Sequence, residues 1–84
     1  MLVYTLVTLG PSDFMDVSVF DTEEKAINRV ITDLEDRYRM NEDTSDMSKE
    51  DFNVLAAGVA TDLREYGHAY DNFVEYSIYA CEVQ

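Results

Sequence analysis

Carboxylates dominate the chemistry open to this chain of 84 residues, because 18 acidic side chains stand against six basic ones and the formal net charge is −12. The excess is greatest in residues 40–84, where ten acids face only Lys49 and Arg64 and leave a net charge of −8. Carboxylates without a predicted cleft do not indicate catalysis. A negative field of this size repels nucleic acids and attracts basic partners. The sequence therefore predicts a binding protein and not an enzyme.

Nucleophilic catalysis and zinc binding have few residues to use, since the chain holds one histidine and one cysteine. His68 falls in a predicted loop, and Cys81 falls near the far end of the last predicted strand. Unless the chain folds back, extended chain separates them by roughly 30 Å or more at about 3.3 Å per residue. A catalytic pair needs hydrogen-bond contact, so we expect no catalytic residue here and no zinc site.

Oxygen ligands that calcium prefers are concentrated between Asn41 and Asp51. An EF-hand loop, however, requires glycine at its sixth position and glutamate at its twelfth. Counted from Asn41, those positions hold Asp46 and Phe52. The three glycines stand alone at 10, 58 and 67, so there is no glycine-rich phosphate loop either. We expect neither a metal nor a cofactor.

These side chains must be positioned by one domain spanning residues 1–84, a length that suits a single core. Strand patterns cover 2–9, 15–19 and 73–83, and helical patterns begin at 21 and at 48. The order strand–strand–helix–helix–strand (β-β-α-α-β) predicts an α+β fold, in which both helices pack on one face of a three-stranded sheet. Residues 2–9 are apolar on both alternating faces, which predicts the middle strand.

The alternation within the other strands predicts their faces. Met15, Val17 and Val19 alternate with Asp16 and Ser18, which indicates a strand with one solvated face. In the last strand one set should face the helices and the other should face outward. The inward set is Val74, Tyr76, Ile78 and Ala80, and the outward set is Glu75, Ser77, Tyr79 and Cys81.

Both helices carry start signals and an apolar face. Asp21 and Glu24 can form a capping box, and the pairs Asp33/Arg37 and Glu35/Arg39 have i, i+4 spacing. Ser48 can cap the second helix and Gly67 can end it. The side of the second helix opposite its core face holds small or apolar residues, which indicates packing on the first helix or contact with a partner. Those residues are Val54, Ala57, Gly58 and Thr61.

The remaining candidate for function is a set of carboxylates accompanied by tyrosines in the C-terminal half. Carboxylates about 5–6 Å apart on a helix can bind the lysine and arginine side chains that normally hold phosphates. Tyrosine is enriched at interface hot spots. The ten residues of this predicted partner site, called the acidic band below, are Glu42, Asp43, Asp46, Glu50, Asp51, Asp62, Glu65, Tyr66, Tyr70 and Asp71.

The size, the charge of −12, the strand–helix order and the segment VSVFDTEEKA, which runs from strand into helix, resemble the small acidic inhibitors that phages and mobile elements direct against host defence. These are the anti-CRISPR and anti-restriction proteins. The resemblance implies a partner such as a CRISPR effector, a restriction enzyme or another nuclease, and a place in the host cytoplasm. It assigns no individual residues.

Three other interpretations of the same features stay open. An immunity protein or antitoxin against a basic nuclease would need the same surface. A phage structural or assembly protein could form a homodimer through the outer sheet face or the small-residue helix face. The acidity could also serve solubility or adaptation to salt. The single cysteine is typical of a reducing cytoplasm, the start MLVYTLVTLG lacks the basic segment of a signal peptide, and no apolar run is long enough for a membrane span.

Overall fold

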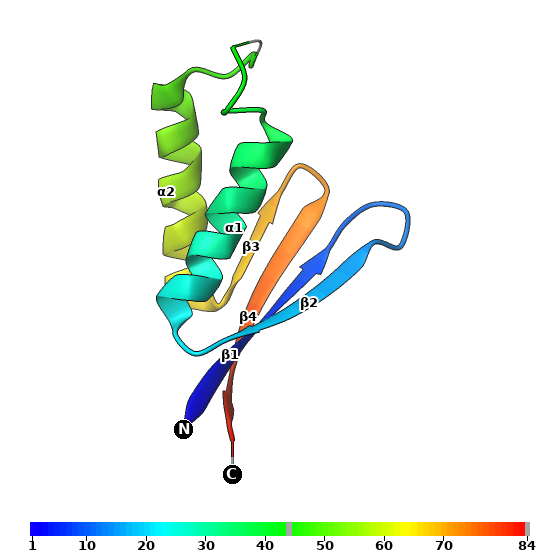
Figure 1. Ribbon diagram of the computed structural model, residues 1–84, viewed down its shortest axis with the longest axis vertical. Coiled ribbons are helices and arrows are strands. Elements are labelled where there is room, and N and C mark those ends of the chain that lie inside the picture. The colour runs from blue at the N-terminus through cyan, green and yellow to red at the C-terminus, as the bar shows by residue number, and fades with distance from the viewer. Residues whose placement is uncertain (44, 84) are drawn as a thin grey trace.

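The structure is a computed structural model that describes residues 1–43 and 45–83 (Figure 1). It confirms an α+β fold with two helices and an antiparallel sheet, but the sheet has four strands and not the predicted three. The elements are β1 (Leu2–Leu9), β2 (Met15–Phe20), α1 (Glu23–Arg37), α2 (Lys49–Tyr66), β3 (His68–Asp71) and β4 (Val74–Glu82).

The additional strand is β3, which occupies the predicted loop around His68. It is four residues long and pairs antiparallel with β4, from His68 opposite Ser77 to Asp71 opposite Val74. The turn between them places both Asn72 and Phe73 at positive φ, 47° and 69°. Turns with two positive φ values are normally signalled by glycine. No glycine stands here, so no local pattern indicated a hairpin.

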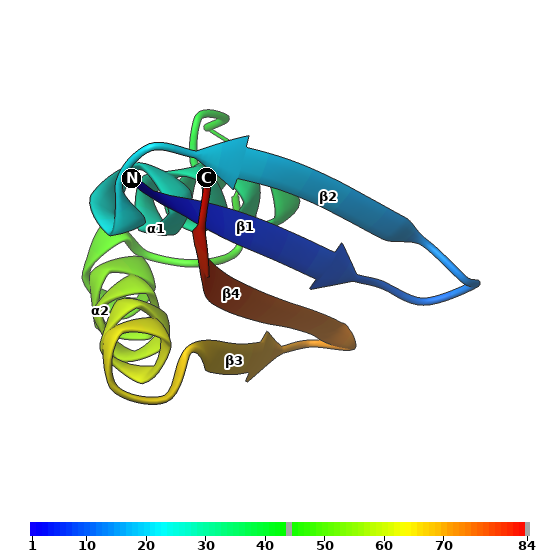
Figure 2. The same ribbon diagram turned by 90° about the horizontal axis from the view of Figure 1, so that it is seen from below.

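The strand order in the sheet is β2-β1-β4-β3, and all neighbours are antiparallel. The prediction that residues 2–9 form an interior strand is confirmed, because β1 pairs with β2 on one side and with β4 on the other. The two edges of the sheet are β2 and the short β3 (Figure 2).

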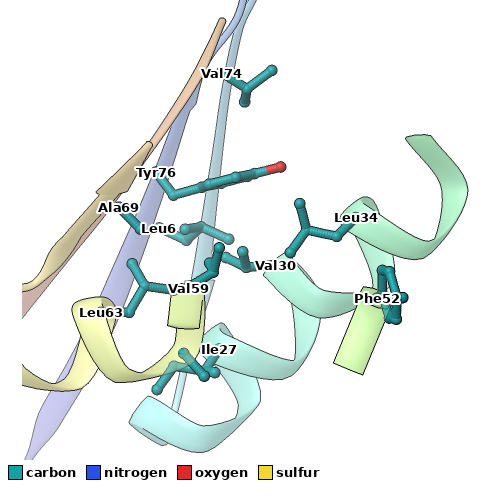
Figure 3. Packing of buried hydrophobic residues seen from close by; sticks show 11 residues of the cluster. Leu6, Ile27, Val30, Leu34, Phe52, Val59, Leu63, Ala69, Val74 and Tyr76 are labelled. Carbon is teal, nitrogen blue, oxygen red and sulfur yellow. The ribbon is translucent and has the colours of Figure 1, made fainter. Parts of the chain in front are cut away.

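Both helices cover the same face of the sheet, as predicted (Figures 1 and 2). Side chains from the two layers meet in one core, in which Tyr76 is fully buried between sheet and helices (Figure 3). Ala80 was expected to face the helices, yet it is exposed, because the ends of β1 and β4 that carry the termini extend past them. The core consists of Leu6, Ile27, Val30, Leu34, Phe52, Val59, Ala60, Leu63, Ala69, Val74 and Tyr76.

The two faces of β2 are the reverse of what an amphipathic strand would normally show. Met15, Val17 and Val19 are 62%, 52% and 60% exposed, whereas Asp16 and Ser18 lie on the helix side and are half-buried. The alternation was predicted correctly, but its solvated face is the apolar one. The register explains this, since Val17 pairs with Val7 and shares its face, opposite the core residue Leu6.

The helix ends confirm two predictions and correct two. Ser48 accepts a hydrogen bond from the Asp51 amide at 3.1 Å, and Gly67 ends α2 at φ 70°. The cap of α1 is Thr22 and not Asp21, since the Thr22 hydroxyl accepts from the Lys25 amide.

The C-terminus of α1 also differs from the prediction. Arg39 was expected on the helix, paired with Glu35. Instead α1 ends at Arg37 and Arg39 has a φ of 57°. The amides of Arg39 and Met40 donate to the carbonyls of Asp36 and Glu35, as in a Schellman motif. This turn takes Arg39 out of the i, i+4 geometry of a helix.

Candidate functional site

The side of α2 that points away from the core carries acids at both of its ends and small residues between them. At 3.6 residues per turn these positions fall on one side of the helix, and all eight are exposed. We call them the outer face of α2: Glu50, Asp51, Val54, Ala57, Gly58, Thr61, Asp62 and Glu65. Four carboxylates therefore flank a neutral centre.

One of the two predicted interpretations was that the small residues of this face pack against the first helix. The structure shows that they do not. Val54 is 75% exposed, and a Cβ atom added at Gly58 would meet nothing within 4 Å. The helices meet instead through their larger apolar residues, among them Ile27 on α1 and Leu63 on α2 (Figure 3). The neutral centre is therefore open to solvent.

The carboxylates of the outer face have no cationic partner within the described chain. Within residues 1–43 and 45–83, no ion pair involves Glu50, Asp51, Asp62 or Glu65. The nearby Arg64 turns to Glu24 on α1, with 3.0 Å between Nη2 and Oε1. Four negative charges on this face are therefore not neutralised internally.

The helix dipole stabilises acids at one end of this face and destabilises them at the other. Glu50 and Asp51 lie in the first turn of α2, where the positive end of the dipole stabilises acids. Glu65 lies in the last turn, where an acid costs about 0.3–1 kcal/mol. Helix stability thus accounts for the acids at the N-terminal end but opposes Glu65.

The connection between the helices carries the next part of the acidic band. Glu42, Asp43 and Asp46 are exposed there. Glu42 is already engaged, because its Oε2 lies 2.7 Å from Arg39 Nε. That hydrogen bond and the charge of Arg39 lower the pKa of Glu42. Within residues 1–43 and 45–83, Asp43 and Asp46 form no ion pair.

A pocket of about 410 Å³ lies where the end of α1, the connection and the start of α2 meet. Arg37 and Arg39 line it together with Asp46 and Asp51, and Tyr38 and Met47 complete the wall. Two cations and two anions leave no net charge to attract a charged ligand. The pocket shares Asp51 with the outer face of α2, but Glu50, Asp62 and Glu65 do not line it. We therefore place the candidate site on the outer face of α2 and not in this pocket.

The last three members of the acidic band lie in three different places. Tyr66 is 74% exposed at the end of α2, near Asp62 and Glu65. Tyr70 lies on the sheet face opposite the helices, since it pairs with Glu75 while its neighbour Ala69 is buried. Asp71 is half-buried and engaged within the fold. The ten residues therefore do not form one continuous surface.

Asp71 belongs to a polar network that the sequence did not reveal. Its Oδ2 accepts from Arg37 Nη2 at 3.2 Å and from the Tyr38 hydroxyl at 2.7 Å. Arg37 also donates to the Tyr76 hydroxyl at 2.9 Å, and Tyr76 donates to Asp33. The predicted pair Asp33/Arg37 is present, at 3.4 Å. The only sequence signal was this i, i+4 pair, because the other partners are more than 30 positions away.

The hairpin β3–β4 also changes the expected distance between His68 and Cys81. His68 lies opposite Ser77, and its Nδ1 is 3.1 Å from the Ser77 hydroxyl. Cys81 is four residues farther along β4, about 13 Å at 3.3 Å per residue. The chain does fold back here, but the two side chains are still not in contact. In residues 1–43 and 45–83, no three side chains of the metal-binding types come together.

Comparison of the chain with models of protein families, with curated proteins and with solved structures finds no match in any of the three. Neither helix, within the part of the chain that the structure describes, combines the length and the apolar character that crossing a membrane requires.

Proposed function

We propose that this chain is an acidic binding protein that inhibits a nucleic-acid-handling protein by occupying its basic DNA- or RNA-binding surface. The contact surface is the outer face of α2, together with Tyr66 at its C-terminal end and the exposed Asp43 of the connection that precedes the helix. Its partner is a protein that binds phosphates through lysine and arginine. A CRISPR effector, a restriction enzyme or another nuclease has such a surface.

The observation that carries this proposal is the arrangement of charge on α2. Two pairs of exposed, internally unpaired carboxylates lie on one side of the helix with small residues between them. Glu50 and Glu65 are 15 residues apart, about 22 Å along the helix axis. A partner can therefore approach the neutral centre closely while its cations reach the acids at both ends. This is the usual plan of an interface, with a less polar centre and a charged rim.

The cost of Glu65 supports a binding role over a role in stability. A glutamate in the last turn opposes the helix dipole, and no cation in residues 1–43 and 45–83 forms an ion pair with it. Tyr66, next to it, exposes an aromatic ring of the kind that anchors interfaces. Solubility alone would be served equally well by an acid in a first turn.

The experiment is an inhibition assay on enzymes with basic nucleic-acid sites. The purified chain is added to a CRISPR effector, to restriction enzymes and to a nuclease toxin, and DNA cleavage is measured. We expect one class to be inhibited, with inhibition weakening as NaCl rises because the charge attraction is screened. Inhibition of the toxin alone would indicate an immunity protein.

The matched variants are Glu65→Lys and Asp36→Lys. Both residues are exposed and lie in the last turn of a helix, but Asp36 lies on α1, away from the outer face of α2. Glu65→Lys should weaken inhibition at least tenfold, whereas Asp36→Lys should leave it nearly unchanged. Equal effects of the two variants would show that only net charge matters, and would contradict the proposed surface.

A further inference from the structure

The sheet face that the helices leave uncovered is largely apolar. Its side chains are those that alternate with the buried ones along each strand, and we call them the open face. Three strands contribute apolar rows in register: Val7 lies opposite Val17, and Thr5 lies between Val19 and Tyr79. The open face consists of Val3, Thr5, Val7, Leu9, Met15, Val17, Val19, His68, Tyr70, Glu75, Ser77, Tyr79 and Cys81.

The open face is too large to be an ordinary surface of a monomer. Its most exposed apolar members lie between 41% and 62% exposed, namely Leu9, Met15, Val17, Val19, Tyr70 and Tyr79. For side chains of this size that amounts to roughly 700 Å². The largest apolar patch of a typical monomer is about 300–600 Å². A standard protein interface buries about 800 Å² on each partner, so the open face has the area that one interface needs.

Charge limits what can cover this face. The chain has 18 acids, but Glu75 is the one acid on the open face, and no lysine or arginine lies there. A strongly basic partner would therefore be drawn to the helices and not to this face. A second copy of the chain is repelled almost everywhere else, because its net charge is also −12. The open face is the place where two copies can meet with little repulsion.

We propose that the open face is the interface of a homodimer, in which two sheets pack face to face around a two-fold axis. Such an interface is self-complementary, since each copy supplies the same apolar rows. Packed sheets lie about 10 Å apart, and the helices then lie on the two outer sides. The acids of α2 in the two copies are separated by roughly 20 Å or more, beyond the Debye length of about 8 Å at physiological salt.

The dimer would place two acidic helix faces on opposite sides of one particle. It does not depend on the inhibitory function proposed above, because the open face and the outer face of α2 share no residue. If both proposals hold, each dimer presents two binding surfaces, and a partner with two basic sites would bind with avidity.

Sedimentation equilibrium of the protein alone tests the dimer, in reducing buffer so that the exposed Cys81 cannot cross-link. The wild type should show twice the chain mass of 9.6 kDa. Val17→Lys places a charge in the centre of an apolar row, and it should raise the dimer dissociation constant at least 100-fold. Since this variant lowers the net charge from −12 to −11, greater overall repulsion cannot explain the loss.

Val54→Lys is the matched control, because it makes the same replacement at a position on α2 that is also exposed. It should remain dimeric. Tyr79→Lys tests the open face from β4, in case Val17→Lys reduces folding as judged by circular dichroism. The proposal is overturned by a monomeric wild type over a hundredfold concentration range, or by Tyr79→Lys that stays dimeric.

Salt separates the dimer from the inhibitory contact. NaCl screens the repulsion between two acidic copies, so the dimer should become tighter as NaCl rises from about 0.05 to about 0.5 M. The contact with a basic partner should become weaker over the same range. A dimer that dissociates in high salt would contradict an apolar interface. Failure to inhibit any nuclease would leave the sedimentation result intact.

Discussion

Arg37 and Asp71 form an ion pair that joins the end of α1 to the hairpin β3–β4, with 3.2 Å between Nη2 and Oδ2. A second guanidinium nitrogen donates to the Asp71 carbonyl oxygen at 3.4 Å. Tyr38 and Tyr76 complete the network, and the Arg37 guanidinium lies 5.8 Å from each of their ring centres. The hairpin that the sequence did not reveal is therefore held by residues at the C-terminal end of α1.

Replacing Asp71 by asparagine should destabilise the fold. The side chains of Asp71 and Arg37 are only 13% and 24% exposed, so loss of the carboxylate leaves a half-buried guanidinium without its main partner. We expect a loss of about 1–3 kcal/mol in the free energy of unfolding, measured by urea denaturation. Asp43→Asn is the control, since Asp43 is exposed, and it should change stability by less than about 0.5 kcal/mol. Equal effects would mean that the network contributes nothing.

Alkaline pH should unfold the protein through its two networked tyrosines. Burial, and then the hydrogen bond to Asp33, raise the pKa of Tyr76 above its ordinary value. Burial and the hydrogen bond to Asp71 raise the pKa of Tyr38 in the same way. The tyrosines therefore ionise at a lower pH in the unfolded chain than in the folded one. Their contribution to stability is fully present below a pH of about 10 and falls as the pH rises above it.

Tyr38→Phe tests this pH dependence. It removes one of the two ionising groups, so the fall in stability above a pH of about 10 should become shallower than in the wild type. Urea denaturation at a series of pH values measures the slope. An unchanged slope would contradict the assigned role of the Tyr38 hydroxyl.

What could be predicted from the sequence depended on how local each signal was. The interior position of Leu2–Leu9 followed from its apolar residues on both faces, and the ends of α2 followed from Ser48 and Gly67. The faces of β2 could not be assigned, because a period of two says which residues share a face but not which face the helices cover. That choice is made by the pairing of Val17 with Val7, which is a tertiary contact.

The acidic band was predicted as one surface, but its members were grouped by position in the chain. The members on α2 do lie on one surface, because helical spacing alone places them on the same side of the helix. Tyr70 and Asp71 separated from it because β3, which places them, had no signal of its own: the strand is short and its turn lacks glycine. Asp71 forms an ion pair with Arg37, which is 34 positions away in the chain, and no local pattern indicates that contact.

The β3–β4 turn offers a direct test of this explanation. Phe73 is 72% exposed and has a φ of 69°, a conformation that costs a residue with a Cβ about 1–2 kcal/mol. Phe73→Gly should therefore stabilise the protein by about 1 kcal/mol, since the sequence becomes Asn-Gly, which is preferred in such turns. Thermal unfolding would show a higher Tm. A lower Tm would mean that the phenyl ring makes a stabilising contact.

Two substitutions on adjacent residues test whether the outer face of α2 is open in the free protein. Gly58→Ala should raise the free energy of unfolding by about 0.5–1 kcal/mol, because alanine favours the helix and its Cβ meets no neighbour. Ala57→Gly should lower it by a similar amount. Urea denaturation of both variants provides the comparison. A destabilising Gly58→Ala would indicate that another surface already packs on this face.

Reversing Glu65 to lysine should separate stability from binding. A cation in the last turn interacts favourably with the helix dipole, so Glu65→Lys should gain about 0.3–1 kcal/mol of stability. The same variant should lose inhibition, as argued above. Circular dichroism during thermal unfolding and the cleavage assay together measure both effects. A variant that lost both stability and inhibition would not support a binding role for this carboxylate.

The most direct test of the central claim is capture of the partner on the immobilised chain, followed by elution with duplex DNA. If the carboxylates of α2 occupy a surface that normally binds phosphates, DNA competes for it. A protein retained from a cell lysate should then be released by DNA, should bind the Asp36→Lys column equally well, and should not bind the Glu65→Lys column. A partner that stays bound in excess DNA and binds the Glu65→Lys column as well as the wild type would contradict the claim.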